Sequence, residues 1–346
     1  MKLGNILVGK DCPTFVIAEI GINHNGNVNL AKKLILTAKE CGANCVKFQK
    51  RVVTDSFTQK KLEEPYETKN SYGKTYGLHK NHLELSDESY RELKRYADDL
   101  NILFIATPCD IASVDFLDSI NVPFFKVASG DLRNRPLIEH IASKKKPIII
   151  STGMSNLETI LEVYDYLSKL CKDLVVLSCT SSYPTPLNEV NLNVIKTLQE
   201  KLPKAVIGYS GHEKGIVITL AAVAIGASVI ERHFTLDKSM RGSDHCCSLE
   251  PVELDKLIGN IRQVEIATGS YIKEVRESEK KFMSKLTKSL VSTRFIPKGT
   301  IITREMLTTK HPGSGISPMK IYNVIGKKTL EDIKKDTVIF KNQILY

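Results

Sequence analysis

The sequence has no long hydrophobic run. No window of its 346 residues approaches the ~18 to 20 consecutive apolar residues that a transmembrane helix needs. The opening residues, MKLGNILVGKDCP, also lack the apolar core of a secretory signal peptide. We therefore expect a cytoplasmic protein with no membrane-embedded part.

A disulfide framework is missing as well. The chain has eight cysteines, scattered along its whole length. Cys41 and Cys45 are the nearest approach to a spaced pair, but no second pair follows them. In a long chain without a secretory signal, this distribution favours reduced thiols.

Compact basic segments are absent too, although the formal net charge is +10. The lysines lie in helix-like segments and are mixed with acidic residues, as in residues 132–146 and 272–285. No basic run is interleaved with aromatic residues, so we expect no nucleic-acid partner. The charge indicates either a solvated basic surface or an anionic substrate held by local lysines.

Eight short segments are rich in valine, isoleucine and phenylalanine and are almost continuously apolar. This composition is typical of strands in a parallel sheet that is buried on both faces. Helical patterns lie between them: Leu30, Leu34 and Ala38 are spaced four residues apart, and Ser86 is an expected N-cap. The expected strands are residues 15–21, 45–49, 103–108, 124–129, 147–152, 174–181, 205–212 and 228–235.

Eight successive strand-then-helix units predict a (β/α)8 TIM barrel over residues 1–270, in preference to a doubly wound sheet. Residues 50–85 form a long polar insertion after the second strand, where barrels carry active-site loops. Residues 271–286 are charged and predict a linker. Residues 287–346 contain short strand-like pieces between turns and predict a small, mostly β domain.

Polar residues stand at the carboxyl ends of all eight expected strands, where the βα loops of a barrel converge. A single serine or threonine in such a place is more often a helix cap or a turn former. Their concentration at one end instead predicts a site. These residues are Glu19, Lys47, Gln49, Thr107, Lys126, Ser129, Ser151, Thr152, Ser181, Tyr183, Ser210, His212, Glu231 and His233.

His212 and His233 end the seventh and eighth strands. Neighbouring strands lie about 4.8 Å apart, so both imidazoles can reach one divalent cation. For either histidine alone, a structural role is the simpler alternative. Two imidazoles leave coordination positions open for water or substrate, as a catalytic metal requires. Asp244, in the loop after the eighth strand, is a candidate further ligand or orienting residue.

Lys47 and Lys126 end the second and fourth strands. A lysine at such a position is either a Schiff-base nucleophile or a fixed positive charge for phosphate or carboxylate. The serines around the two lysines favour an anion site, because hydroxyl groups donate to the oxygens of an anion. Glu19 is a candidate acid or base.

Ordered motifs run through the whole chain: AEIGINHNG, VKFQ, FKVASGD, ISTGM, CTSSYPTP, GYSGH, ERHFTLDK and GSDHCCSLEP, followed by IPKGTIITREML and KHPGSGI. In order and spacing they resemble the sialic acid synthase family, which has a C-terminal antifreeze-like (SAF, β-clip) domain. The resemblance implies a condensation of phosphoenolpyruvate with an open-chain N-acylhexosamine. C3 of phosphoenolpyruvate attacks the sugar aldehyde, water adds to C2, and phosphate leaves by C–O cleavage.

The resemblance also implies roles for individual residues. His212 and His233 would bind Mn²⁺, or Mg²⁺ or Co²⁺, and Glu19 would be the general acid or base. The phosphoenolpyruvate side would consist of Lys47, Lys126, Thr107, Ser129, Ser151, Ser181 and Ser210. The sugar or the attacking water would be contacted by Glu19, Gln49, Tyr183 and Asp244, and Asp131 stands where some members have Glu.

Two features qualify the resemblance. A domain-swapped homodimer is implied, but His311 stands where bacterial members often have an arginine that the partner subunit supplies; a neutral histidine offers one donor where arginine offers five. The insertion after the second strand resembles the animal-type enzymes, which use N-acetylmannosamine 6-phosphate. Lys69 and Lys74, with His79 and Lys80, are candidate contacts of that second phosphate; an exposed basic loop is the alternative.

Other functions stay open. A Schiff-base aldolase would use Lys126 or Lys47 and would form an adduct that borohydride traps. A non-catalytic sugar- or ice-binding protein is the third possibility, because the tail resembles ice-binding modules. For a synthase, the sugar can be N-acetylmannosamine, its 6-phosphate, or a precursor of legionaminic, pseudaminic or deaminated sialic acid.

Overall fold

The computed structural model describes residues 1–345. The chain divides into two compact units, Met1–Gly269 and Ser270–Tyr346. The first unit contains an eight-stranded parallel sheet with the order β5-β4-β3-β10-β9-β8-β7-β6. Its strands are β3 Phe15–Gly21, β4 Cys45–Lys50, β5 Leu103–Pro108, β6 Phe125–Val127, β7 Ile148–Ser151, β8 Leu174–Cys179, β9 Val206–Gly211 and β10 Val229–His233.

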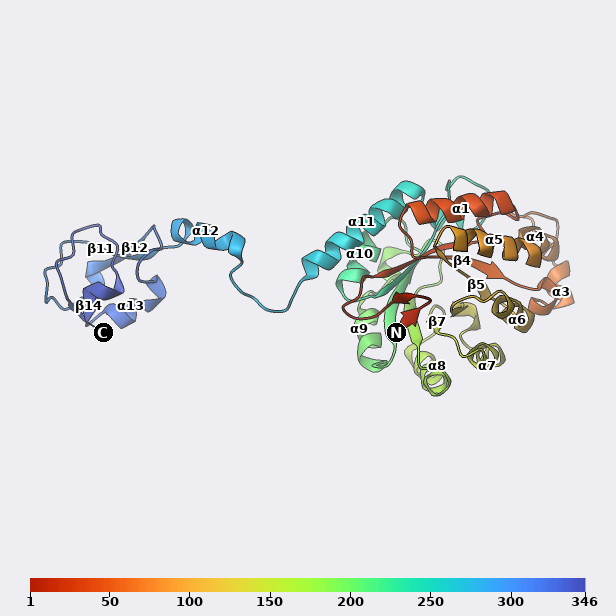
Figure 1. The fold of residues 1–346 in the computed structure, drawn as a ribbon, viewed down its shortest axis with the longest axis horizontal. Helices are drawn as coiled ribbons and strands as arrows, with labels where there is room; N and C mark the ends of the chain where they lie inside the picture. The colour runs from red at the N-terminus through yellow and green to blue at the C-terminus, as the bar shows by residue number, and fades with distance from the viewer. Residues whose placement is uncertain (346) are drawn as a thin grey trace. The chain divides into compact units, whose positions relative to one another are not determined.

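The two ends of this order, β5 and β6, also lie side by side, which closes the sheet into a barrel. Figure 1 shows the helices arranged around the strands. The predicted (β/α)8 fold is therefore confirmed. The surrounding helices are α1 Val28–Glu40, α5 Asp87–Asp99, α6 Ile111–Ser119, α7 Arg135–Ser143, α8 Leu157–Leu170, α9 Asn193–Lys201, α10 Val217–Ala224 and α11 Pro251–Thr268.

Local sequence explains why these elements form. All seven residues of β3 are buried, as expected for a strand with its inner face in the barrel and its outer face under helices. The Ser86 side chain accepts a hydrogen bond from the backbone N–H of Ser89, so the predicted N-cap of α5 is confirmed. Asn27 and Asn156 cap α1 and α8 in the same way.

A small antiparallel hairpin, β1 Lys2–Leu3 and β2 Ile6–Leu7, precedes the barrel and was not predicted. Gly4, in its turn, lies against the side chains of Leu103 and Pro123, which stand at or before the starts of β5 and β6. The hairpin therefore covers the amino end of the barrel, opposite the end where the polar strand tips meet.

The insertion after β4 contains helical structure that the sequence interpretation, a loop, did not include. Its helices are α2 Val53–Ser56, α3 Gln59–Glu63 and α4 Tyr76–Leu83. Tyr72 stacks on His82 with ring centroids 4.4 Å apart, and its hydroxyl donates to the backbone oxygen of Arg241, 2.7 Å away. The insertion is thereby attached to the loop that follows β10.

The second unit has its own small hydrophobic core. The predicted linker, residues 271–286, includes the exposed helix α12 Glu277–Leu286. The other elements are β11 Ser289–Ser292, β12 Leu307–Lys310, α13 Ile321–Val324, β13 Lys328–Thr329 and β14 Ile344–Leu345. The buried core residues are Leu290, Ile296, Ile302, Leu307, Ile316, Val324, Ile333, Ile339 and Ile344. Among residues 1–345, none of the helices combines the length and the apolar character needed to cross a bilayer.

Candidate active site

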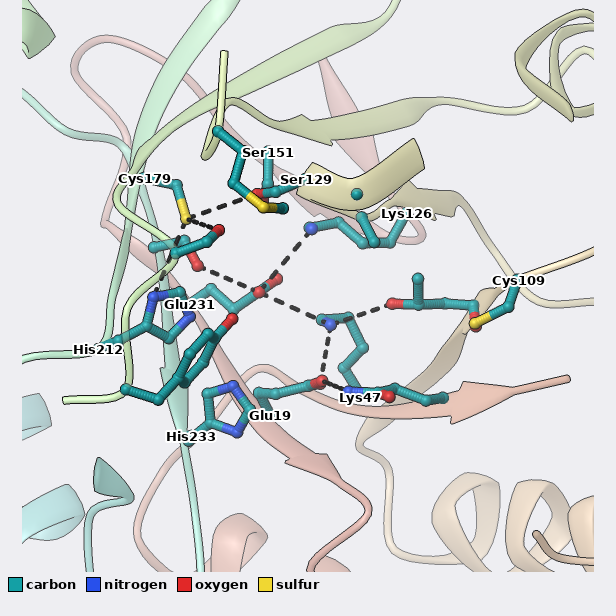
Figure 2. Close-up of a pocket in the computed structure, with 18 of the residues that line it drawn as sticks. Glu19, Lys47, Cys109, Lys126, Ser129, Ser151, Cys179, His212, Glu231 and His233 are labelled. Atoms are coloured by element: carbon teal, nitrogen blue, oxygen red, sulfur yellow. Dashed lines mark hydrogen bonds and ion pairs between the residues drawn. The ribbon is translucent and has the colours of Figure 1, made fainter. Parts of the chain in front are cut away.

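A cavity of about 300 Å³ lies at the carboxyl ends of the barrel strands. Figure 2 shows charged, hydroxyl and imidazole groups pointing into it from several strands. It is lined by these residues expected from the sequence: Glu19, Lys47, Gln49, Thr107, Lys126, Ser129, Ser151, Ser181, Tyr183, Ser210, His212 and His233. The structure therefore brings together most of the predicted site in one place.

The sheet register explains this convergence. Glu19 of β3 pairs with His233 of β10 on one side and with Lys47 of β4 on the other. Paired residues of neighbouring parallel strands point to the same face, so these three side chains form one layer inside the barrel. Glu231 lies two residues before His233 and therefore points inward as well.

Four buried charged groups form a connected network in the cavity (Figure 2). The Lys47 ammonium lies 2.8 Å from Oε2 of Glu19 and 3.6 Å from Oε1 of Glu231, and it donates to Oγ1 of Thr107 at 3.1 Å. The Lys126 ammonium lies 3.9 Å from the same Glu231 oxygen. Glu231 is thus shared between two lysines that come from different strands.

The two carboxyl groups have opposite electrostatic surroundings. Burial raises the pKa of Glu19 to about 7, because it outweighs the attraction of Lys47. Burial also acts on Glu231, but Lys126 and Lys47 together outweigh it and lower the pKa of that carboxyl to about 2. Near neutral pH the site therefore has two ammonium groups and only one firmly ionised carboxylate. This excess of positive charge favours an anion.

Hydroxyl groups surround the lysines. Ser210 donates to Glu231 at 3.3 Å, whereas the buried Oγ of Ser151 has no hydrogen-bond partner. A Cβ at Gly153 would lie 2.1 Å from Oγ of Ser181 and 2.8 Å from Oγ of Ser129, so only glycine leaves room for both hydroxyls. An unpaired buried hydroxyl is costly unless a ligand completes its hydrogen bonding.

The two histidines stand side by side, with ring centroids 5.4 Å apart. Nδ1 of His212 lies 2.8 Å from the backbone oxygen of Thr180, so this nitrogen carries the proton and leaves the Nε2 lone pair free. Nδ1 of His233 is buried without a hydrogen-bond partner, 3.8 Å from Oδ2 of Asp244. Burial lowers the pKa of His233 to about 4, so its imidazole is neutral at pH 7.

These two imidazoles fit the donor set of a divalent cation. At His212, burial is outweighed by the contacts with Cys179 and with the Thr180 backbone oxygen, which raise the pKa, so a metal bound there would displace a proton. Among residues 1–345, no three His, Cys, Asp or Glu side chains lie close enough together to enclose a metal ion. The protein would therefore supply two nitrogen ligands and leave the other coordination positions to water or substrate, as in catalytic and unlike structural metal sites.

The remaining predicted residues lie outside the cavity lining. Asp131 accepts a hydrogen bond from Asn134 at 3.0 Å before α7. Lys69 and Lys74 are exposed on the insertion. His311 belongs to the second unit, where its Nδ1 lies 2.8 Å from the backbone oxygen of Thr287. Asp244 stands beside His233, as described above.

Glu231, one of the expected strand-end residues, also lines the cavity, although the sequence interpretation gave it no individual role. Strand alternation places Glu231 on the same face as His233, which agrees with its expected place at the strand end. The charged and thiol-bearing lining residues that were not expected at all are Arg51, Cys109 and Cys179. Arg51 follows the end of β4 and donates to Oε1 of Gln49 at 2.7 Å. No sequence pattern distinguishes Cys179, whose sulfur lies 3.7 Å from Oγ of Ser129.

Comparison with known proteins agrees with this geometry. The NeuB family model matches residues 34–273, and the SAF domain model matches residues 287–345. The N-acetylneuraminate-9-phosphate synthase of Homo sapiens is 48% identical over 338 residues, which cover 97% of this chain and 94% of the human protein. The N,N'-diacetyllegionaminic acid synthase of Campylobacter jejuni is 44% identical and covers 94% of this chain and 98% of its own length.

A solved structure is also similar. The N-acetylneuraminic acid (sialic acid) synthetase from Leptospira borgpetersenii, crystallised in complex with citrate, superposes with a TM-score of 0.73 at 36% identity; the match covers 81% of this chain and 94% of that chain. The protein therefore belongs to the NeuB family of sialic acid synthases and carries a SAF domain after the barrel.

Proposed function

We propose that this protein condenses phosphoenolpyruvate with N-acetylmannosamine 6-phosphate and water, giving N-acetylneuraminate 9-phosphate and phosphate. One observation carries the proposal: two buried ammonium groups, balanced by one firmly ionised carboxylate, share a cavity with two neighbouring imidazoles. The human relative of 48% identity, an N-acetylneuraminate-9-phosphate synthase, supports this choice of product.

Phosphoenolpyruvate occupies the lysine side of the cavity. Lys47 and Lys126 supply its positive charge, and charge-assisted hydrogen bonds are stronger than neutral ones. The unpaired hydroxyl of Ser151, with those of Ser129 and Ser181, donates to the anion's oxygens. Because Lys47, Lys126 and Ser151 are already buried on barrel strands, little ordering of these three side chains is left to occur on binding.

A divalent cation, Mn²⁺ or else Mg²⁺ or Co²⁺, is held by His212 and His233. The free Nε2 of His212 and the unpartnered Nδ1 of His233 are the observations that support this assignment. When bound, the cation supplies Lewis-acid polarisation of the sugar's aldehyde oxygen. Oδ2 of Asp244 lies 3.8 Å from Nδ1 of His233, beyond hydrogen-bond distance, so Asp244 stands beside the proposed metal site.

The reaction balances with these groups. C3 of phosphoenolpyruvate forms a bond to the aldehyde carbon, and the aldehyde oxygen takes up a proton. Water then adds to the electron-deficient C2 and gives up one proton. The C2–O bond to phosphate breaks with its electron pair leaving on phosphate, and the C2 hydroxyl loses its proton to phosphate to become the ketone. Glu19 is placed to move a proton, because its pKa of about 7 lets it carry and release one at neutral pH.

The sugar's phosphate is assigned to Arg51 and Lys80. Arg51 lines the cavity beside Gln49, and Lys80 is half-buried. Burial, together with the nearby Arg51 charge, lowers the pKa of Lys80 to about 8, so a bound phosphate dianion would restore its full charge. Lys69, Lys74 and Lys80 all lie outside the cavity lining, but Lys69 and Lys74 are exposed. The half-burial of Lys80 and the effect of Arg51 on its pKa favour Lys80 for this role.

A related sugar is the second candidate substrate. The relative from Campylobacter jejuni, 44% identical, is an N,N'-diacetyllegionaminic acid synthase. Such a substrate would require the same lysines and histidines but no phosphate contact. The Schiff-base aldolase uses the same cavity, and burial does lower the pKa of Lys126, as a nucleophilic lysine requires.

A phosphate-release assay tests the proposal. Phosphoenolpyruvate and Mn²⁺ are combined with N-acetylmannosamine 6-phosphate, N-acetylmannosamine or mannose, and inorganic phosphate is measured. We expect the 6-phosphate to react with the highest kcat/KM. Release with none of these sugars would reject the assignment, and a covalent adduct after borohydride treatment would support the aldolase.

We further propose that the protein is a cytoplasmic homodimer, as the family resemblance implies. Sedimentation equilibrium of the purified full chain tests the oligomeric state. A mass of one chain at micromolar concentration would contradict the dimer.

A further inference from the structure

A fully buried ion pair lies directly behind the two histidines. Arg232 precedes His233 in β10, and Glu213 follows His212 after β9; both members of the pair are 0% exposed. Nη1 of Arg232 lies 2.9 Å from Oε1 of Glu213, and its Nη2 donates to the backbone oxygen of Glu213 at 2.6 Å. The pair therefore joins the neighbours in sequence of both proposed metal ligands.

The pair stands where the strand ladder ends. The last registered pair between β10 and β9 is Arg232 with Gly211, so His212 lies beyond the ladder on its strand. On the β9 side, His233 has no registered backbone partner to fix its distance from His212. The Arg232 guanidinium continues the connection past this point, because it binds the backbone oxygens of both Glu213 and Gly215.

Hydrogen bonds from neighbouring side chains hold the Arg232–Glu213 pair in place. The Tyr209 hydroxyl donates to Oε2 of Glu213 at 2.7 Å, and Thr219 of α10 donates to Oε1 at 3.2 Å. A Cβ at residue 211 would lie 2.6 Å from Oε2 of Glu213, so Gly211 leaves the space that the carboxylate occupies. Both oxygens of Glu213 and both terminal nitrogens of Arg232 have protein partners.

We propose that the Arg232–Glu213 pair is a positioning element that sets the separation and orientation of His212 and His233 and thereby the affinity for the divalent cation. This inference rests on the metal site of the proposed function. A fully desolvated ion pair is rarely needed for stability, because uncharged residues of similar volume often serve as well. Residues that orient metal ligands, in contrast, typically change metal affinity by about 10- to 100-fold when they are replaced.

The experiment measures Mn²⁺ binding to the full chain without substrates, from the electron paramagnetic resonance signal of free Mn²⁺. The test variant is Arg232→Met/Glu213→Gln, which removes both charges and leaves neither unpaired. We expect its dissociation constant for Mn²⁺ to rise about 10- to 100-fold while the protein stays folded. Arg232→Lys keeps the positive charge but lacks the planar guanidinium that binds two acceptors at once. We expect its dissociation constant to lie between those of the unchanged protein and the double variant.

The control variant is Arg262→Met/Glu265→Gln. Arg262 and Glu265 form an ion pair at 2.7 Å, and Arg262 also binds the backbone oxygen of Thr14, just before β3. The same chemical change is thus made at the amino end of the barrel, far along β3 from the cavity. We expect unchanged Mn²⁺ affinity in this control.

His233→Ala distinguishes an error in the proposed metal site from an error in the proposed positioning role. If this variant binds Mn²⁺ as the unchanged protein does, the metal site itself is wrong. If His233→Ala loses binding but a folded Arg232→Lys or double variant keeps the original dissociation constant, the positioning role is overturned and the metal site stands. Thermal unfolding of each variant verifies that it is folded, and Arg232→Lys decides the matter if the double variant does not fold.

Discussion

The Lys47 ammonium lies 2.8 Å from Oε2 of Glu19, and both side chains are almost completely buried. Burial, with a smaller contribution from the neighbouring Glu231 carboxylate, nevertheless raises the pKa of Glu19 to about 7. Lys47 keeps its charge, since the two carboxylates together outweigh the effect of burial and raise its pKa. Before substrates bind, the site therefore contains a carboxyl group that titrates near physiological pH.

This titration predicts how stability depends on pH. The pKa of Glu19 is raised from 4.5 to about 7, so between these values the native state binds a proton that the unfolded state releases. The contribution of this group to stability therefore falls as the pH rises from about 4.5 to 7. Glu19→Gln cannot titrate, so its melting temperature relative to the unchanged protein should rise over this range. Thermal unfolding at several pH values between 5 and 8 (about one unit apart) tests this. A difference that stays constant, or that shrinks toward pH 8, would contradict the raised pKa.

Removal of one lysine charge should weaken phosphoenolpyruvate binding. Lys126→Met leaves Glu231 with one ammonium partner and removes a charge from the anion site. We expect kcat/KM for phosphoenolpyruvate to fall on the order of 100-fold, because a hydrogen bond to a charged group is worth about 1.5 to 3 kcal/mol. Steady-state kinetics with varied phosphoenolpyruvate measures this.

Two further variants sharpen the test. Lys146→Met removes an ammonium whose partner is Asp118 at the surface, and it should leave the kinetics unchanged. Lys126→Arg keeps a positive charge but cannot form a Schiff base. Residual turnover in Lys126→Arg agrees with an anion site, whereas complete loss together with borohydride trapping in the unchanged protein would point to the aldolase.

Much of the fold was predictable from the sequence, because its signals are local. The strands of the barrel are buried on both faces, so continuous apolar runs in the sequence predict them. The strand β3, for example, is buried at every position. The insertion after β4 was harder. Its helix α4 has only three buried residues and contains Gly77, so no clear amphipathic pattern marks it. Tyr72 and Arg241, whose contact joins two loops, are far apart in the sequence, and nothing local predicts their pairing.

The site was predictable where it depends on strand ends and unpredictable where it depends on loops and pairings. The tips of β3, β4 and β10 place Glu19, Lys47 and His233 by register alone. Arg51 follows the end of β4 and Lys80 belongs to α4, and no local pattern predicts how this part of the insertion folds. The Arg232–Glu213 pair depends on outward-facing side chains, and a sequence offers no way to tell which outward charges will meet.

Metal removal should abolish turnover without unfolding the protein. His212 and His233 are the only protein ligands we assign, and a two-ligand site contributes little to folding compared with a closed structural site. We expect protein treated with a chelator to release no phosphate, to regain activity with Mn²⁺, and to melt within a few degrees of the metal-loaded form. Activity that survives chelation, with Mn²⁺ absent by elemental analysis, would refute the assignment.

His233→Ala complements this test. Because burial lowers the pKa of His233 to about 4, its imidazole needs no deprotonation to bind a metal at neutral pH. Between pH 6 and 8, roughly two units above its pKa and beyond, His233 should therefore release no proton on Mn²⁺ binding. Calorimetry in buffers of different ionisation enthalpy measures total proton release; any release in this range should come from His212, whose pKa is raised, and should not exceed one proton per Mn²⁺. His233→Ala should lack measurable binding in the same experiment.

Selectivity for the phosphorylated sugar should depend on Arg51 and Lys80. Arg51 lines the cavity, and its charge helps to lower the pKa of Lys80, so we assign one phosphate to both cations. We expect Arg51→Met or Lys80→Met to lower kcat/KM for N-acetylmannosamine 6-phosphate about 10- to 100-fold, the value of a charge-assisted hydrogen bond. The kcat/KM for unphosphorylated N-acetylmannosamine should change little.

The matched controls are Lys69→Met and Lys74→Met, which remove the same charge from the same insertion at exposed positions. If these variants lose the preference for the 6-phosphate while Lys80→Met keeps it, the phosphate lies over the outer part of the insertion. If each of the four variants has the same kcat/KM for both sugars, the insertion does not bind the sugar's phosphate. An unphosphorylated nonulosonate precursor is then the better candidate substrate. Only a loss confined to Arg51 and Lys80, and to the phosphorylated sugar, agrees with a phosphate held where the insertion meets the cavity.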